Sequence, residues 1–250
     1  MDDLFGVIKS GARSGEVSSI VNRMRKQSPN ADRAEAQSTI ALDGVAFSGN
    51  VMHLDDYLVG LGGRIDNLEP LAASTFNGGG EPGLSPHRLI LSGVKKKGKE
   101  FFADLYGDFC IAIYDLRSGL LTLARDVLGV CPVFYSHSPK LSLFSPTMQG
   151  LLGSKEVDGT PSPEKIFFFL QGTELPADVS CFKAVRRLPA AHLCILESDC
   201  EAVVSRYHVF QNDASLVSDF PDDNVSRFRQ LLYDAVRVRL PSHGLIGSEV

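Results

Sequence analysis

The cysteines are the most reactive side chains in this sequence, because a thiolate can attack a carbonyl carbon or bind a metal ion. The chain of 250 residues has five of them, Cys110, Cys131, Cys181, Cys194 and Cys200. Their number is odd, none shows a CxxC spacing, and three lie inside apolar runs typical of strands. The pattern favours reduced, buried cytosolic thiols, with Cys110 and Cys131 filling a core rather than acting as nucleophiles.

The histidines and lysines give no pattern of a metal or polyanion site. The six histidines are scattered, and no two are four residues apart, the spacing at which two ligands share a helix face. The run 95–99, Lys-Lys-Lys-Gly-Lys, is interpreted as a solvated helix end. With a formal net charge of −5, the composition predicts neither a nucleic-acid partner nor an anionic membrane partner.

The hydrophobic residues, 44% of the chain, suffice for a large core but form no long apolar run. The longest runs, 110–114 and 166–170, are far shorter than the roughly 20 residues that cross a bilayer. The first eight residues open with acids and lack the pattern of a secretory signal. We therefore expect a cytoplasmic protein without a membrane-spanning segment.

Hydrophobic periodicity predicts an α+β domain over 1–207, a linker over 208–223 and the start of a second domain over 224–250. Four strands at 108–115, 120–125, 133–136 and 141–144 are expected to form one antiparallel meander. The helix expected at 224–240 has Asn224 as its N-cap and Pro241 as its terminator. Further strands are expected at 4–8, 39–42, 45–47, 51–53, 57–61, 191–197 and 202–207, and further helices at 16–26, 66–73, 87–94, 100–105 and 162–170.

Two motifs in the middle of the chain resemble those of asparagine synthetases. Residues 105–115, LYGDFCIAIYD, resemble the pattern L-x-G-x-F-A-F-A-x-x-D, and residues 123–135, LARDVLGVCPVFY, resemble RD-x-LG-x-x-P-L-Y-Y. Residues 63–67, GRIDN, are similar to the NGEIYN turn, and residues 188–192, LPAAH, to the LPPGH strand entry. Residues 228–240 and 247–250 are similar to the helix and strand that lead into the SGGLDS loop.

The resemblance implies a fold and a two-part enzyme. The N-terminal part would be a class II glutamine amidotransferase, an Ntn-hydrolase-like αββα sandwich of two antiparallel sheets that hydrolyses glutamine. It would be followed by the first helix and strand of an α/β ATP-pyrophosphatase-like synthetase domain, in which the SGGLDS loop serves ATP and Mg²⁺. Because the sequence stops before that loop, we expect no cofactor within these 250 residues.

The nucleophile that the family requires has no counterpart here. The family uses a cysteine as residue 2, whose thiolate attacks the glutamine carboxamide. This sequence has Asp2 at that position, and Phe5 at the position aligned by the following glycine, and its first cysteine is Cys110. The resemblance therefore implies no catalytic residue in this chain.

The glutamine pocket is predicted to survive only in part. The Asn-Gly pair that forms the family's oxyanion hole is Gly62-Gly63 here, so the side-chain donor is lost. Asp104 matches the aspartate that receives the substrate amine, although an exposed structural role at a helix end is the alternative interpretation. We expect a vestigial pocket of Gly62, Gly63 and Asp104. The Arg125-Asp126 pair is expected to act in a structural ion pair or turn.

Three hypotheses follow. The chain is the scaffold half of an ATP-dependent amide-forming synthetase, inactive on its own, as in the similar β-lactam synthetases and lasso-peptide cyclases. Alternatively, it is an active glutamine-hydrolysing asparagine synthetase whose N-terminus is misassigned, or a non-enzymatic partner-binding remnant. The expected partner is the remainder of the synthetase domain, in cis or as a separate chain, and a homodimer is a further possibility.

Overall fold

A computed structural model describes residues 3–29, 38–76, 85–173, 176–211 and 221–240. The chain divides into two compact units, Met1–His208 and Val209–Val250. The first unit contains two six-stranded sheets and the helices that cover them, and the second contains helix α7, Pro221–Arg239. The strand start expected at 244–247 lies outside the described residues. No helix within these ranges is long and apolar enough to cross a membrane.

The first sheet has the strand order β10-β8-β9-β1-β3-β2, and all of its neighbouring strands are antiparallel. Its central strand β1 lies between β3 and β9, with Gly6 opposite both Phe47 and Phe144. The strands are β1 (Phe5–Lys9), β2 (Ser38–Leu42), β3 (Val45–Gly49), β8 (Phe134–Ser138), β9 (Leu141–Ser145) and β10 (Arg186–Arg187).

The second sheet has the order β12-β11-β7-β6-β5-β4 and is also antiparallel throughout. Its longest pair is β5 with β6, which are in register from Tyr57 opposite Asp115 to Ile65 opposite Gly107. The strands are β4 (Val51–Leu54), β5 (Tyr57–Ile65), β6 (Gly107–Asp115), β7 (Leu121–Arg125), β11 (His192–Leu196) and β12 (Val203–Arg206).

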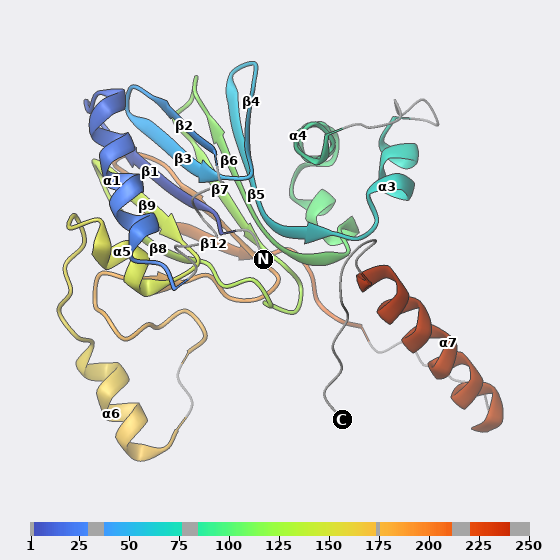
Figure 1. Ribbon diagram of the computed structural model, residues 1–250. Coiled ribbons are helices and arrows are strands. Elements are labelled where there is room, and N and C mark those ends of the chain that lie inside the picture. The colour runs from blue at the N-terminus through green and yellow to red at the C-terminus, as the bar shows by residue number, and fades with distance from the viewer. Residues whose placement is uncertain (1–2, 30–37, 77–84, 174–175, 212–220, 241–250) are drawn as a thin grey trace. The chain divides into compact units, whose positions relative to one another are not determined.

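The sheets and helices form four layers (Figure 1). Helices α1 (Ser14–Lys26) and α5 (Met148–Gly153) cover the outer face of the first sheet. Helices α3 (Leu68–Thr75) and α4 (Pro86–Lys97), with the 3₁₀ helix η1 (Gly98–Asp104), cover the second sheet. A third cluster of buried side chains lies between the sheets. This is the αββα sandwich that the resemblance to asparagine synthetases implies.

Strand β6 shows why the central strands have nearly continuous apolar sequences. Cys110 and Ala112 contribute to the cluster between the sheets, whereas Phe109, Ile111 and Ile113 pack toward the helices. Successive side chains of a strand point to opposite faces. Both faces of this strand are covered, so both sets of side chains are apolar.

Three expectations were wrong. The four middle strands do not form one meander, because β6 and β7 belong to the second sheet and β8 and β9 to the first. Both hairpins contribute side chains to the same cluster between the sheets, so their apolar patterns are alike. Helix α7 begins at Pro221 rather than after Asn224, since proline suits the first turn of a helix. Cys181 and Cys200 are exposed rather than buried.

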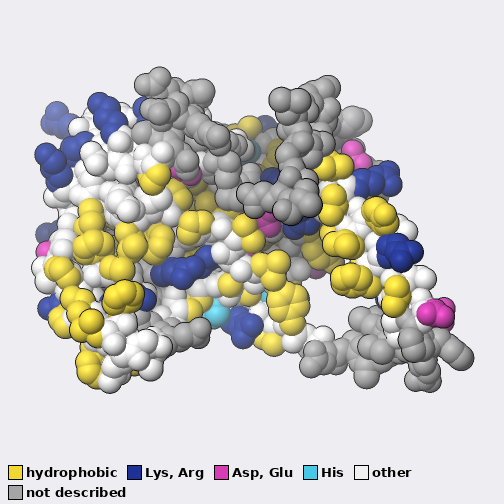
Figure 2. All heavy atoms as spheres, turned by 60° about the horizontal axis from the view of Figure 1, so that its bottom comes forward, with side chains coloured by type: hydrophobic (Ala, Val, Ile, Leu, Met, Phe, Trp, Pro, Cys, Tyr) yellow, Lys and Arg dark blue, Asp and Glu magenta, His cyan; other side chains and the backbone are white. Residues whose placement is uncertain are grey.

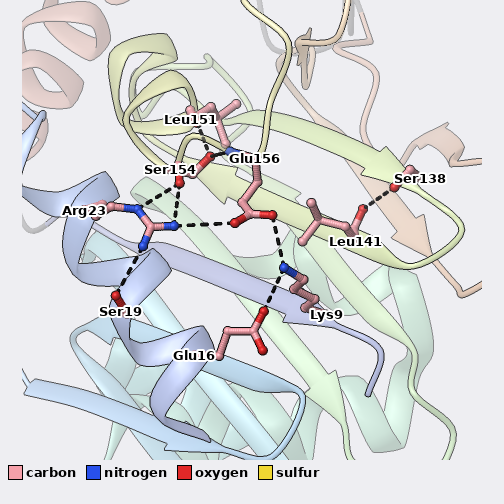
Figure 3. A network of polar contacts seen from close by, with 9 residues as sticks. All are labelled: Lys9, Glu16, Ser19, Arg23, Ser138, Leu141, Leu151, Ser154 and Glu156. Carbon is pink, nitrogen blue, oxygen red and sulfur yellow. Dashed lines mark hydrogen bonds and ion pairs between the residues drawn. The ribbon is translucent and has the colours of Figure 1, made fainter. Parts of the chain in front are cut away.

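A network of charged side chains joins β1, α1 and the segment after α5 (Figure 3). Lys9 Nζ lies 2.8 Å from Glu16 Oε1 and 3.1 Å from Glu156 Oε2. Arg23 donates to the Ser154 carbonyl oxygen at 2.7 and 3.0 Å, and it lies 3.5 Å from Glu156 Oε1. These groups are partly exposed, so each pair contributes about 0–1 kcal/mol.

The network predicts a pH dependence that centres on Lys9. Hydrogen bonds to Glu16 and then Glu156 raise the pKa of Lys9 above its ordinary value. A raised lysine pKa stabilises the fold below the unfolded pKa, and that contribution is lost as the pH rises through the folded pKa. We expect Glu16→Gln to lower the Lys9 pKa, measured by NMR titration of the Lys9 side chain. An unchanged Lys9 pKa would contradict the network.

Candidate functional site

Gly63 lies near the end of β5, where the chain comes too close to its neighbours for any side chain. Its φ is +82°, in the left-handed region that favours glycine. A Cβ placed on Gly63 would overlap the carbonyl oxygen of Asp108 and lie 2.8 Å from Cys131 Sγ. The position predicted for the oxyanion hole is therefore packed against β6 and against a thiol from the loop after β7.

Asp104 lies at the end of η1, and its carboxylate is not directed into the core. Its Oδ2 lies 2.6 Å from Lys97 Nζ, and both side chains are about two-fifths exposed. The Asp104 backbone carbonyl accepts a hydrogen bond from Asn67 Nδ2 at 2.8 Å, while Asn67 Oδ1 accepts from the Tyr106 N–H at 3.0 Å. Asn67 thus ties the segment after β5 to the segment between η1 and β6. The predicted Gly63 and Asp104 lie at the ends of β5 and η1, directly before these two connected segments.

Arg64 carries positive charge beside Gly63. Its guanidinium lies 3.4 Å from Asp66 Oδ1 and 3.6 Å from Asp108 Oδ2. The arginine side chain is 39% exposed, whereas the side chains of Asp66 and Asp108 are only 9% and 16% exposed. The GRIDN segment therefore forms a charged edge at the end of β5 and β6.

The start of β1 is buried, and its side chains pack in the core or form hydrogen bonds there. Phe5 is fully buried and packs with the cluster between the first sheet and α1. Asp3 is also buried, and its Oδ2 accepts a hydrogen bond from Ser28 Oγ at 2.8 Å. Asp2 lies outside the described residues. Of the two residues considered for the nucleophile position, Phe5 is a core residue.

The Arg125-Asp126 pair organises the loop between β7 and β8, one of the connections by which the chain passes from one sheet to the other. Arg125 is buried and donates to the carbonyl oxygens of Cys131 and Leu188, each at 2.7 Å, and to that of Gly129. Asp126 is fully buried and accepts from the N–H groups of Val130 and Cys131, each at 2.9 Å. Arg125 thus binds carbonyl groups of this loop, and Asp126 binds N–H groups of the same loop. Sequence analysis pointed to a turn, but it gave no indication of these partners.

The buried thiols are poor nucleophiles. Burial raises the pKa of Cys131 to about 12, with the neighbouring Asp126 as the next cause. Burial also raises the pKa of Cys194 to about 12, and it raises the pKa of Cys110 well above its ordinary value. Because the thiolate is the reactive form, these three cysteines are protonated and inert at neutral pH.

No group of three or more side chains suited to hold a metal ion occurs in the described part of the chain. Within that part, we also find no glycine-rich loop of the SGGLDS type that could surround the phosphates of ATP.

The two-sheet αββα sandwich, with Gly62 and Gly63 on β5 next to the edge strand of the second sheet, has the fold of Ntn-type glutamine amidotransferases. A model of the glutamine amidotransferase domain family matches residues 56–208, and the chain belongs to this family. Two solved structures show the same fold at 10–12% identity over 84% of this chain and 50% of theirs. They are the glutamine phosphoribosylpyrophosphate amidotransferase of B. subtilis, with a TM-score of 0.55, and an allosteric regulatory enzyme of purine biosynthesis, with a TM-score of 0.57.

The sequence is also similar to proteins named asparagine synthetases. It is 26% identical over 209 residues to the putative glutamine-hydrolyzing asparagine synthetase 2 of Methanocaldococcus jannaschii, covering 82% of this chain and 40% of that protein. It is 26% identical over 154 residues to asparagine synthetase B of Escherichia coli (strain K12), covering 62% of this chain and 23% of that protein. The chain thus spans less than half the length of these relatives.

The loop after β7 yields a stability prediction. In Asp126→Asn, one of the two N–H groups would face an amide NH₂ instead of an acceptor, which costs about 1–3 kcal/mol. Asp115 is the matched control, since one oxygen, Oδ1, accepts from both the Arg117 and the Ser118 N–H groups, at 2.9 and 3.4 Å. We expect Asp115→Asn to retain both bonds and to lose much less free energy of unfolding in urea. Equal losses in the two variants would contradict the role of Asp126.

A second prediction concerns the packing of Gly63. Gly63→Ala must force β5 away from Asp108 and Cys131, so we expect a loss of at least about 2 kcal/mol in the free energy of unfolding. Gly15→Ala in α1 is the control, because nothing lies within 4 Å of its added Cβ. That change should be neutral or stabilising by about 0.4–1 kcal/mol. A Gly63→Ala variant as stable as Gly15→Ala would show that the site has free space.

Proposed function

We propose that this chain is the N-terminal part of an asparagine synthetase-like, ATP-dependent amide-forming ligase, in which the amidotransferase domain has lost glutaminase chemistry and serves as a scaffold. One observation carries the proposal. The residue at the head of β1 is Phe5, which is fully buried under α1. A phenyl ring cannot attack a carboxamide, and a buried one is not accessible to it.

The other groups near the site support the same conclusion. Cys131 lies next to Gly63, but its raised pKa keeps the thiol protonated at neutral pH. Gly62 has no side-chain amide to stabilise an oxyanion, and the loss of one such donor costs about 2.7–4 kcal/mol in other enzymes. The carboxylate of Asp104 is engaged by Lys97. The chain therefore has no reactive nucleophile near this site, it lacks the side-chain oxyanion donor at Gly62, and the carboxylate of Asp104 is paired with Lys97.

The partner in this proposal is the remainder of a synthetase domain, in cis or as a separate chain. Helix α7 supports it, because an apolar stripe recurs at intervals of three and four residues while every member is half or more exposed. The stripe consists of Val225, Phe228, Leu232 and Val236. ATP and Mg²⁺ would be bound by that partner. The five free cysteines fit a reducing compartment such as the cytoplasm.

A glutaminase assay tests the proposal. The purified chain is incubated with glutamine, and glutamate release is followed with a coupled dehydrogenase. We expect release equal to that of buffer alone. The variant Cys181→Ser/Cys200→Ser is the matched control, because it removes the two exposed thiols and leaves the three buried ones.

The same variant makes a positive result interpretable. Glutamate release that persists in Cys181→Ser/Cys200→Ser and disappears in Cys131→Ser would overturn the loss of glutaminase chemistry. Reaction with an electrophilic glutamine analogue gives a second readout by intact mass. We expect no adduct on Cys181→Ser/Cys200→Ser under native conditions.

A further inference from the structure

A cavity of about 350 Å³ lies where the turn between β4 and β5 meets helix α4 and the residue after α3. We call it the α4 cavity. Its volume falls in the range of small-molecule sites, about 300–1,000 Å³. The cavity lies at the Tyr57 end of β5, whereas Gly63 lies six residues further along the strand, about 20 Å away. It is therefore separate from the vestigial amidotransferase pocket.

One face of α4 supplies the polar wall of this cavity. Arg88, Ser92 and Lys95 follow one another at intervals of four and three residues, which places them on the same side of the helix. Lys95 Nζ lies 4.2 Å from the centroid of the Tyr57 ring, a cation–π contact that holds it beside the start of β5. The Arg88 side chain is exposed, and among the described residues no hydrogen bond or ion pair engages its guanidinium.

The deeper part of the wall is apolar. Leu54 and Leu91 are buried and belong to the cluster between the second sheet and its helices. The half-buried ring of Phe76 packs against the same cluster. A ligand in the α4 cavity would therefore meet an apolar surface on one side and the cations of α4 on the other. Small-molecule sites combine these two features, since apolar contacts supply affinity and a few polar groups fix the orientation.

The charges around the cavity favour a monoanion. Among the described residues of the lining, Arg88 and Lys95 supply two positive charges and Asp55 one negative charge, so the sum is +1 with His53 counted as neutral. A carboxylate carries one negative charge and balances this sum. A phosphate group carries about −1.5 to −2 and would place excess negative charge beside Asp55. A guanidinium also presents paired N–H groups that match the two oxygens of a carboxylate.

Exposed apolar side chains alone do not define such a site. Helix α6 (Pro163–Gln171) exposes Phe169 and Leu170, each at 78%, and hydrophobic side chains gather over this part of the surface in Figure 2. The charged residues of α6, Glu164 and Lys165, are both confined to its first turn. In the α4 cavity, cations and apolar side chains instead surround one volume.

We propose that the α4 cavity binds a small organic acid with an apolar body, as its monoanion. The carboxylate contacts Arg88 and Lys95, and the apolar body packs on Leu91 and Phe76. Binding at this site requires neither glutamine hydrolysis nor a synthetase partner. The site is thus a ligand-binding function of the domain that is independent of its proposed role as a scaffold.

Calorimetric and NMR titrations of the 250-residue chain at low salt test the proposal. The probes are benzoate, 3-phenylpropionate and 4-methylpentanoate, and the amide of each acid is its neutral control of the same shape. We expect saturable binding of one molecule of at least one acid, with shifts in the resonances of α4 and of the turn between β4 and β5. The affinity should fall as salt is added, because salt screens the charges. The matching amide should bind about tenfold or more weakly, because it lacks the charge that pairs with arginine.

Arg88→Gln is the central variant, and Arg13→Gln is its matched control. Arg13 is an exposed arginine at the start of α1, in the other half of the sandwich. Arg88→Gln should weaken binding of the acid by about 10- to 100-fold, whereas Arg13→Gln should leave it unchanged. Both side chains are exposed, so both variants should keep the melting temperature of the parent chain. Ser92→Leu fills the cavity without changing its charge, and it should also abolish binding.

Three outcomes would overturn the α4 site. The first is a parent chain that binds none of the three acids, or that binds an acid and its amide equally well. The second is inorganic phosphate that binds more tightly than the acids and depends on Arg88, because it would exclude the choice of a carboxylate. The third is binding of an acid that survives both Arg88→Gln and Ser92→Leu, because the ligand would then lie elsewhere.

Discussion

The fold depends on burying both faces of two antiparallel sheets at once. A chain that contributes strands to both sheets must pass from one to the other, and one such crossing lies between β7 and β8, besides those between β3 and β4 and between β10 and β11. The backbone groups of such a crossing are partly withdrawn from water and must be paired within the protein. Arg125 and Asp126 provide that pairing from the carbonyl and amide sides of one loop. The position of Cys131 beside Gly63 follows from this loop.

The same dense packing explains why the fold persists while its chemistry is proposed to be lost. Gly63 has a left-handed φ, and its backbone lies in close contact with the Asp108 carbonyl oxygen and Cys131 Sγ. The space next to it is occupied by a protonated thiol, and the head of β1 is occupied by Phe5. Neither feature disturbs the sandwich, because each places a buried apolar side chain in the core. A domain of this kind can remain stable as a scaffold without any requirement to bind glutamine.

The elements were largely predictable, but their assembly was less so. Helical spacing located α1, and short apolar runs located β5 and β6, because α1 packs one apolar face on its cluster and both strands are buried between two clusters. Local patterns do not specify which sheet a hairpin joins, and the two middle hairpins were therefore assigned to one meander. The contact of Cys131 with Gly63 joins positions far apart in sequence and has no local signal. Nor does the pattern of α6 reveal that its apolar side chains Phe169 and Leu170 are largely exposed.

The account rests on the claim that no buried cysteine of this chain acts as a nucleophile, and a thiol titration tests it most directly. A chromogenic disulfide reagent is added to the native protein and then to the protein in denaturant. The account predicts that Cys181 and Cys200 react rapidly in the native state, and that Cys110, Cys131 and Cys194 react only after unfolding. A third thiol that reacts rapidly in the native state, and that disappears in Cys131→Ser, would contradict the account.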